Sequence, residues 1–194
     1  MNSEISNLQK CYELLKAVLM DAFRVEVLIL SYPYDNLRQI DHGIRAMVWG
    51  DYNDDNSRHA LMTSNEAHQL FVIKSNLGFY NILAYINSGE HPEFISVGPF
   101  RDEELSADYY TQIIKEAHLS PQHIASMKQI YERLPLVQAD AIIKVTQHII
   151  SNFIPEFATI EPRNIQYSEQ NRSVNIDTDV IHTCLLYTSP SPRD

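Results

Sequence analysis

Histidines are the side chains of this sequence whose type and number first suggest chemistry, because imidazole binds metals and transfers protons near neutral pH. The chain has eight of them. Three fall near predicted strands together with three carboxylates: His59, His68 and His91 with Glu66, Glu90 and Glu93. No HxH, HExxH or CxxC motif directs several ligands to one point. We expect ordinary surface histidines and no metal site, and keep a small metal-dependent enzyme only as an alternative.

The common motifs of nucleophilic and nucleotide-binding enzymes are also absent from the sequence. Cys11 lies on the apolar side of a predicted helix, where a small buried hydrophobic residue is expected rather than a nucleophile. With five glycines in the chain, neither GxGxxG nor GxxxxGK[ST] occurs, and GxSxG is missing. The acidic run Asp102-Glu103-Glu104 precedes a predicted helix and favours its N-terminus. We expect no enzyme and no cofactor.

Aromatic side chains on three predicted strands are the positive indication of a binding site. Alternate residues of a strand face opposite sides, so some of these rings enter the core while others can line a pocket. Two cations at the margins of the strands can orient an anionic ligand, although a solvated surface cation is the ordinary alternative. The predicted ligand-binding residues are Lys74, Tyr80, Tyr85, Phe94 and Arg101. Plain core packing is the alternative for the rings.

These residues depend on a predicted antiparallel meander. Its three apolar runs, 68–75, 79–86 and 93–100, are separated by short turn sequences. Before the meander, hydrophobic spacing predicts a helix over 3–23, a strand over 25–30 and a shorter helix over 37–50. The sequence therefore predicts an α+β fold, with an antiparallel sheet of four to five strands flanked by helices in a GAF- or PAS-like outline.

A helical segment is expected after the meander. One helix begins near Ser106, a second begins at Ser120-Pro121 and ends at Pro135, and a third covers 138–153. In the third helix, Ile142, Val145 and Ile149 are three and four residues apart, as in a coiled-coil seam. This stripe predicts either a signalling helix that pairs in a homodimer or packing onto the chain's own sheet.

Composition and charge are those of one ordinary domain. The chain has 194 residues, of which 44% are hydrophobic, and a formal net charge of −10. That charge has the wrong sign to neutralise phosphates, so we do not expect this chain to bind DNA by itself. No apolar run reaches the roughly 18 residues of a membrane span, and MNSEISNLQK lacks the features of a signal peptide. We expect a soluble cytoplasmic domain without membrane association.

The last residues, 184–194, read CLLYTSPSPRD and differ in composition from the rest. One back-translation of this peptide looks like the transposase adapter used to build sequencing libraries. We therefore expect a disordered, adapter-derived tail, a natural sequence that continues past Thr183, and Cys11 as the single natural cysteine of this piece.

A family resemblance covers most of residues 1–183 and is carried by segments between Phe94 and Ser173. FISVGPFRDEELS is followed by YYTQIIKEAHLSPQHIASMKQIYERLPLV, AIIKVTQHIISNFIPEF and IQYSEQNRS. This order resembles the N-terminal sensor region of bacterial transcriptional regulators of the AraC family, in the subgroup with a GAF- or PAS-like sensor. The resemblance implies a C-terminal DNA-binding domain with two helix-turn-helix units, which this chain lacks.

The expected organisation is a sensor domain over 1–156, a linker over 157–183 and the tail over 184–194. The expected function is a regulatory sensor that responds to a small molecule or a protein and reaches DNA only through the missing domain. The sensor of a signalling histidine kinase is the alternative from another class.

Overall fold

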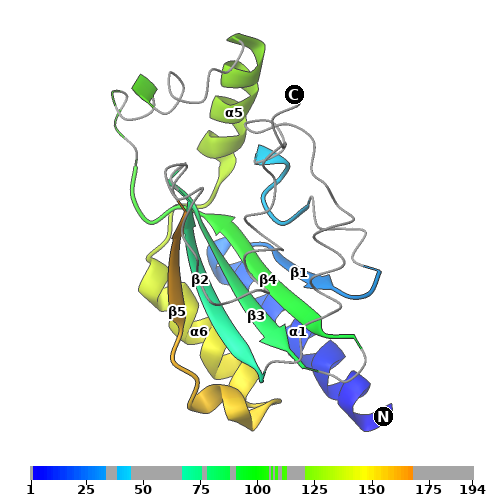
Figure 1. Ribbon diagram of the computed structural model, residues 1–194. Helices are drawn as coiled ribbons and strands as arrows, with labels where there is room; N and C mark the ends of the chain where they lie inside the picture. Colours follow the sequence, from blue (N-terminus) through cyan, green and yellow to red (C-terminus); the bar gives the residue numbers. More distant parts are fainter. Residues whose placement is uncertain are drawn as a thin grey trace, which may run out of the picture.

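The structure is a computed structural model of the 194-residue chain. It describes residues 2–33, 39–44, 67–75, 78–87, 91–104, 106, 108, 111–112 and 121–167. In chain order these form α1 (Asn2–Phe23), β1 (Val27–Leu30), β2 (Gln69–Ser75), β3 (Tyr80–Ile86), β4 (Glu93–Phe100), α5 (Pro121–Arg133), α6 (Ala139–Ser151), the 3-10 helix η2 (Pro155–Ala158) and β5 (Arg163–Tyr167) (Figure 1).

The strands form one five-stranded sheet in the order β1-β4-β3-β2-β5. The meander β2-β3-β4 is antiparallel, and β1 pairs antiparallel with β4. β5, in contrast, pairs parallel with β2, with Ile73 opposite Ile165. The predicted α+β class and the meander are confirmed, whereas the prediction of an antiparallel sheet is wrong, because the sheet is mixed.

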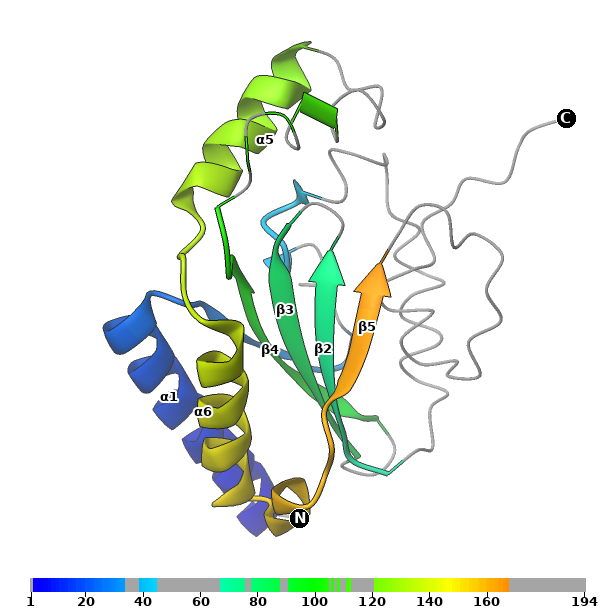
Figure 2. The same cartoon turned by 90° about the vertical axis from the view of Figure 1, so that its left-hand side faces the viewer.

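The course of α6 explains the parallel strand. After β4 the chain passes through α5, and α6 then runs back along the sheet toward the end at which β4 began (Figure 2). The next strand therefore starts at that end and takes the direction of β2 and β4. β5 lies within the stretch 157–183 for which a linker was expected; the domain boundaries themselves stay a prediction.

Most of the predicted elements in the described residues agree with the structure to within two residues. α1 begins at Asn2, and α5 begins at Pro121 as its Ser120-Pro121 signal indicated. Arg24, at φ 58°, adopts a left-handed conformation directly after α1 ends, and β1 starts at Val27, two residues later than predicted. The helix predicted over 37–50 and the one predicted from Ser106 lie largely outside the described residues.

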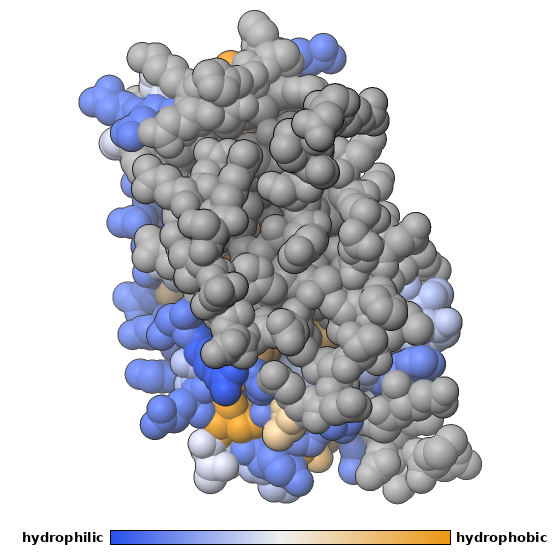
Figure 3. Space-filling model, in the orientation of Figure 1, coloured by the Kyte–Doolittle hydropathy of each residue, from blue (hydrophilic) through white to orange (hydrophobic). Residues whose placement is uncertain are grey.

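One face of the sheet is covered by α1 and α6 (Figure 2). Side chains of both helices and of the sheet form a single hydrophobic cluster, which includes Cys11, Leu15, Leu19, Ile82, Ala84, Ile95, Val97, Ile142 and Ile150. Burial of each large apolar side chain contributes about 1.5–3 kcal/mol to folding. Mostly hydrophilic side chains occupy the left-hand margin of Figure 3, where α6 and β5 face outward.

The stripe predicted as a coiled-coil seam lies in this cluster. Ile142 is 0% and Ile149 7% exposed, and Val145 packs against the same buried residues. These side chains therefore pack onto the chain's own sheet, which was one of the two predicted alternatives. Their contacts give no support for a homodimer through this stripe.

Candidate functional site

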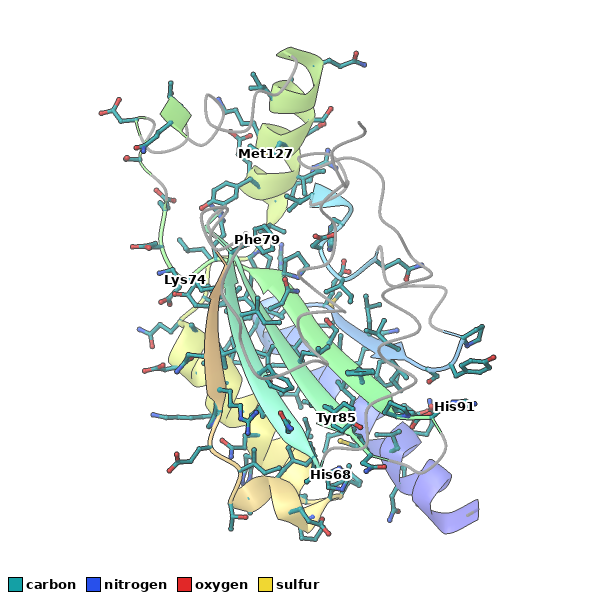
Figure 4. All side chains as sticks on the ribbon, in the orientation of Figure 1. His68, Lys74, Phe79, Tyr85, His91 and Met127 are labelled. Atoms are coloured by element: carbon teal, nitrogen blue, oxygen red, sulfur yellow. The ribbon has the colours of Figure 1, made fainter. Side chains whose placement is uncertain are left out.

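The five predicted ligand-binding residues do not form one site. Lys74 pairs with Tyr80 across β2 and β3, while Tyr85 pairs with Phe94 across β3 and β4. Directly paired residues share a face, and side chains alternate along a strand, so Tyr80 and Tyr85 of the same strand face opposite sides. In Figure 4, Lys74 and Tyr85 lie near opposite ends of the sheet. The structure thus separates the set into two groups, Lys74 with Tyr80 and Tyr85 with Phe94, and leaves Arg101 apart from both.

Lys74 and Tyr80 belong to the helix-covered face, near the end of β4. Lys74 Nζ lies 5.2 Å from the centroid of the Tyr80 ring and 3.7 Å from Glu103 Oε1. The hydrogen bond to the Tyr80 side chain is the main cause of a raised pKa of Lys74, and the charge of Glu103 acts in the same direction. The ammonium therefore stays charged at neutral pH. Lys74 and Glu103 are both solvent-exposed, so their ion pair contributes little to stability.

Arg101 follows β4 directly and contacts the last turn of α5 and the connector between α5 and α6. Its Nε donates to the carbonyl oxygen of Leu134 at 3.2 Å, and its guanidinium lies 4.8 Å from the centroid of the Tyr131 ring. The side chain is half-buried. The contacts favour a structural role at the connector over the anion-orienting role suggested by the sequence.

Asp102 is a functional candidate that the sequence prediction missed. Its Oδ1 accepts a hydrogen bond from the backbone N–H of Ala139, the first residue of α6, at 2.8 Å. The carboxylate therefore satisfies an unpaired amide at the N-terminus of α6, where negative charge is also favoured by the helix dipole. The sequence analysis placed this acidic run before the helix expected from Ser106, which lies largely outside the described residues. The helix that Asp102 contacts starts 37 positions later in the chain.

The second group lies on the sheet face opposite α1 and α6. We call this group the aromatic face: Phe71, Leu83, Tyr85, Phe94 and Ser96, which the strand register places on one side of the sheet. All five side chains are buried. The rings of Tyr85 and Phe94 meet edge to face, with centroids 5.3 Å apart and planes at 69°. Such a geometry adds about 0.5–1.5 kcal/mol beyond the burial of the rings.

Ser96 is the one polar side chain among the five residues that define the aromatic face. It is 1% exposed, and its hydroxyl has no hydrogen-bond partner among the described residues. A buried hydroxyl without a partner costs about 1–3 kcal/mol, so native proteins seldom retain one without a reason. The sequence held a signal for this residue, because Ser96 is the single hydroxyl among the apolar residues of FISVGPF.

Asn81 connects the same face to residues 39–44. Its Nδ2 donates to the carbonyl oxygen of Ile40 at 2.9 Å, and its side chain is 2% exposed. The neighbouring Asp41 is also buried, and its Oδ1 accepts a hydrogen bond from the N–H of Gly43 at 3.1 Å. Polar groups on this side of the sheet therefore hold a turn in place.

His68 and His91 make local contacts within the fold. His68 Nδ1 accepts a hydrogen bond from the N–H of Asn87 at 3.1 Å, and the His91 ring stacks on Tyr32 with centroids 4.2 Å apart. Figure 4 shows the two histidines apart from each other. His59 lies outside the described residues. Within the part of the chain that the structure describes, no three His, Cys, Asp or Glu side chains gather into a group able to hold a metal ion.

Comparisons with protein-family models, with curated proteins and with solved structures find no match to this chain. Among the described helices, none combines the length and apolar character needed to cross a membrane. The site is accordingly described by its own residues. They are the buried aromatic face, in which the Ser96 hydroxyl has no partner among the described residues, and the contacts of Arg101 and Asp102 at the end of β4.

Proposed function

We propose that this chain is the regulatory sensor region of a bacterial transcriptional regulator of the AraC family. The resemblance of segments within residues 94–173 to that family supports the proposal. In this account the sensor has a GAF- or PAS-like fold and works in the cytoplasm. A helix-turn-helix domain encoded beyond Thr183 binds the DNA, and residues 184–194 derive from a sequencing adapter.

The observation that carries the sensor role is the asymmetry of the sheet. The helices α1 and α6 close one face, with Ile142 and Cys11 in their shared core. The other face carries buried aromatic side chains and the hydroxyl of Ser96, which has no partner among the described residues. A buried apolar lining with few polar groups is typical of sites that enclose a small molecule. The signal we propose is accordingly a small molecule with an apolar ring and one hydrogen-bonding group, or a protein that presents such a group.

DNA binding by the complete gene product tests this function. The complete product and residues 1–183 are each incubated with a pool of random DNA duplexes, and retained duplexes are sequenced after several rounds. We expect an enriched sequence for the complete product and none for residues 1–183, whose acidic charge opposes phosphate binding. Enrichment of the same sequence by residues 1–183 alone would contradict the assignment of DNA binding to the missing domain.

The alternative function is that of the sensor of a signalling histidine kinase, and the same complete gene product tests it. Incubation of the complete product with labelled ATP would then label a histidine, and no DNA sequence would be enriched. That result would replace the proposed function and keep the sensor role of the described residues.

A further inference from the structure

We propose that Arg101 and Asp102 are positioning residues that couple the sheet to helix α6, so that a change in β4 changes the placement of α6. The regulatory meaning of this coupling rests on the proposed sensor function. The coupling itself is a property of the described residues and needs no ligand to be measured.

The backbone of Arg101 provides the first part of the coupling. Its N–H donates to the carbonyl oxygen of Pro135 at 2.8 Å, and its carbonyl accepts from the N–H of Val137 at 2.8 Å. Arg101 and Leu136 thereby form a one-residue parallel bridge. The connector between α5 and α6 is therefore attached to the direct continuation of β4, the strand that carries Phe94 and Ser96.

The side chain of Arg101 reaches the end of α5. Its Nε bonds the Leu134 carbonyl oxygen at 3.2 Å, one residue beyond the helix, and its guanidinium lies over the ring of Tyr131 in the last turn. Carbonyl groups at a helix C-terminus carry partial negative charge, which favours a cation at this place. The positive charge of Arg101 therefore lies at the C-terminus of α5, where a cation is favoured.

The side chain of Asp102 reaches the start of α6, through its 2.8 Å bond to the N–H of Ala139. The residue at the N-cap position, Gln138, makes no side-chain capping bond. The cap comes instead from the residue that follows Arg101. Two adjacent residues of opposite charge therefore hold the ends of two helices, each with the charge that its helix end favours.

This arrangement restricts how α6 can move. A displacement of α6 along its axis would break the Ala139–Asp102 bond and strain the bridge between Arg101 and Leu136. At the same time, Ile142 and Ile150 hold α6 against the sheet. A shift of β4 at its end is consequently transmitted to the first turn of α6 rather than absorbed by a loose connector.

The test uses nuclear magnetic resonance of the isotope-labelled full chain. Ser96→Val adds bulk to the aromatic face, on the side of the sheet opposite α6, and displaces β4. We expect it to shift the backbone amide resonances of residues 139–142 in the otherwise unchanged chain. When Ser96→Val is introduced into an Asp102→Ala chain, the resulting shifts should be at least threefold smaller. In an Asp102→Asn chain, whose side-chain oxygen can still accept the hydrogen bond from Ala139, the shifts should regain their full size. Glu104→Ala, which removes a neighbouring exposed carboxylate, is the matched control and should leave them unchanged.

Two results would overturn the coupling: no shift at 139–142 on Ser96→Val, or an equal shift with and without the Asp102 carboxylate. Should Ser96→Val not fold, Ser96→Cys adds less bulk at the same position and serves for the same comparison. Hydrogen exchange gives an independent readout, because loss of the cap should speed exchange of the Ala139 amide about fivefold in Asp102→Ala and leave it unchanged in Glu104→Ala. Neither measurement involves DNA, so failure of the coupling remains distinguishable from failure of the proposed function.

Discussion

Gly98 on β4 leaves no room for a side chain beside Asn81 on β3. A Cβ added to Gly98 would lie 2.9 Å from Asn81 Nδ2 and 2.8 Å from the carbonyl oxygen of Tyr80. Gly98 also has φ +125°, a conformation that side chains rarely adopt. The register of β3 and β4 shifts at this place, between Tyr80 and Ile82. At the same place Asn81 donates a hydrogen bond to Ile40, and the rings of Phe100 and Tyr80 stack with centroids 5.7 Å apart.

Gly98→Ala is therefore expected to destabilise the chain by about 2–4 kcal/mol, as the sum of backbone strain and steric clash. Gly43→Ala is the matched control, because Gly43 also has a positive φ, +76°, but an added Cβ there would have no neighbour within 4 Å. It should cost only about 1 kcal/mol. Urea unfolding measures both. Equal losses in the two variants would show that the contact with Asn81 has no energetic effect.

Ser96→Ala should leave stability unchanged or raise it by about 1 kcal/mol, because it removes a buried hydroxyl that has no partner in the described residues. Asn81→Ala is the contrasting variant. It removes a buried donor that bonds Ile40, and it should destabilise by about 1–3 kcal/mol. Thermal unfolding of the two variants gives the comparison. A marked loss of stability in Ser96→Ala would mean that its hydroxyl is already satisfied in the folded chain.

Ile149→Glu should destabilise the folded chain strongly, because Ile149 is 7% exposed within the helix–sheet core and a carboxylate there loses its hydration. We expect a loss of at least about 3 kcal/mol, seen by urea unfolding. Lys144→Glu, on an exposed position of the same helix, should stay within about 0.5 kcal/mol of the parent. Light scattering run alongside would contradict this account if Ile149→Glu turned a dimer into a folded monomer of unchanged stability.

Cys11 should be unreactive in the folded chain. It is 0% exposed, and burial raises the pKa of its thiol from 9.0 to about 12, so the nucleophilic thiolate is scarce at pH 8. We expect iodoacetamide to modify Cys11 at least tenfold more slowly in native buffer than in urea, with labelling of the Cys11 peptide followed by mass spectrometry. Similar rates in both solutions would place the thiol at the surface.

The same shift has a consequence for stability at high pH. The folded chain holds the Cys11 proton more tightly than the unfolded chain, so this contribution to stability is fully present below pH 9 and is lost as the pH rises toward 12. Cys11→Ala removes the titrating group. Between pH 9 and about 12, the unfolding free energy of the parent should therefore fall relative to that of Cys11→Ala.

Local pattern was enough to predict α1, α5, α6 and the meander, since hydrophobic spacing and the Ser120-Pro121 signal depend on neighbouring residues alone. The parallel pairing of β5 was not predictable in this way, because it follows from the direction in which α6 crosses the sheet. The separation of Tyr80 from Tyr85, in contrast, follows from strand alternation and could have been inferred from the sequence. The bond from Asp102 to Ala139 could not, since it joins residues 37 positions apart.

We propose that this chain is the sensor region of a longer DNA-binding regulator. The nucleotide sequence of the gene beyond the codon for Thr183, recovered from genomic DNA of the source, tests this proposal. We predict a reading frame that continues into two helix-turn-helix units in place of CLLYTSPSPRD. A stop codon at that point, or a continuation into a helix with a phosphoacceptor histidine, would contradict the claim.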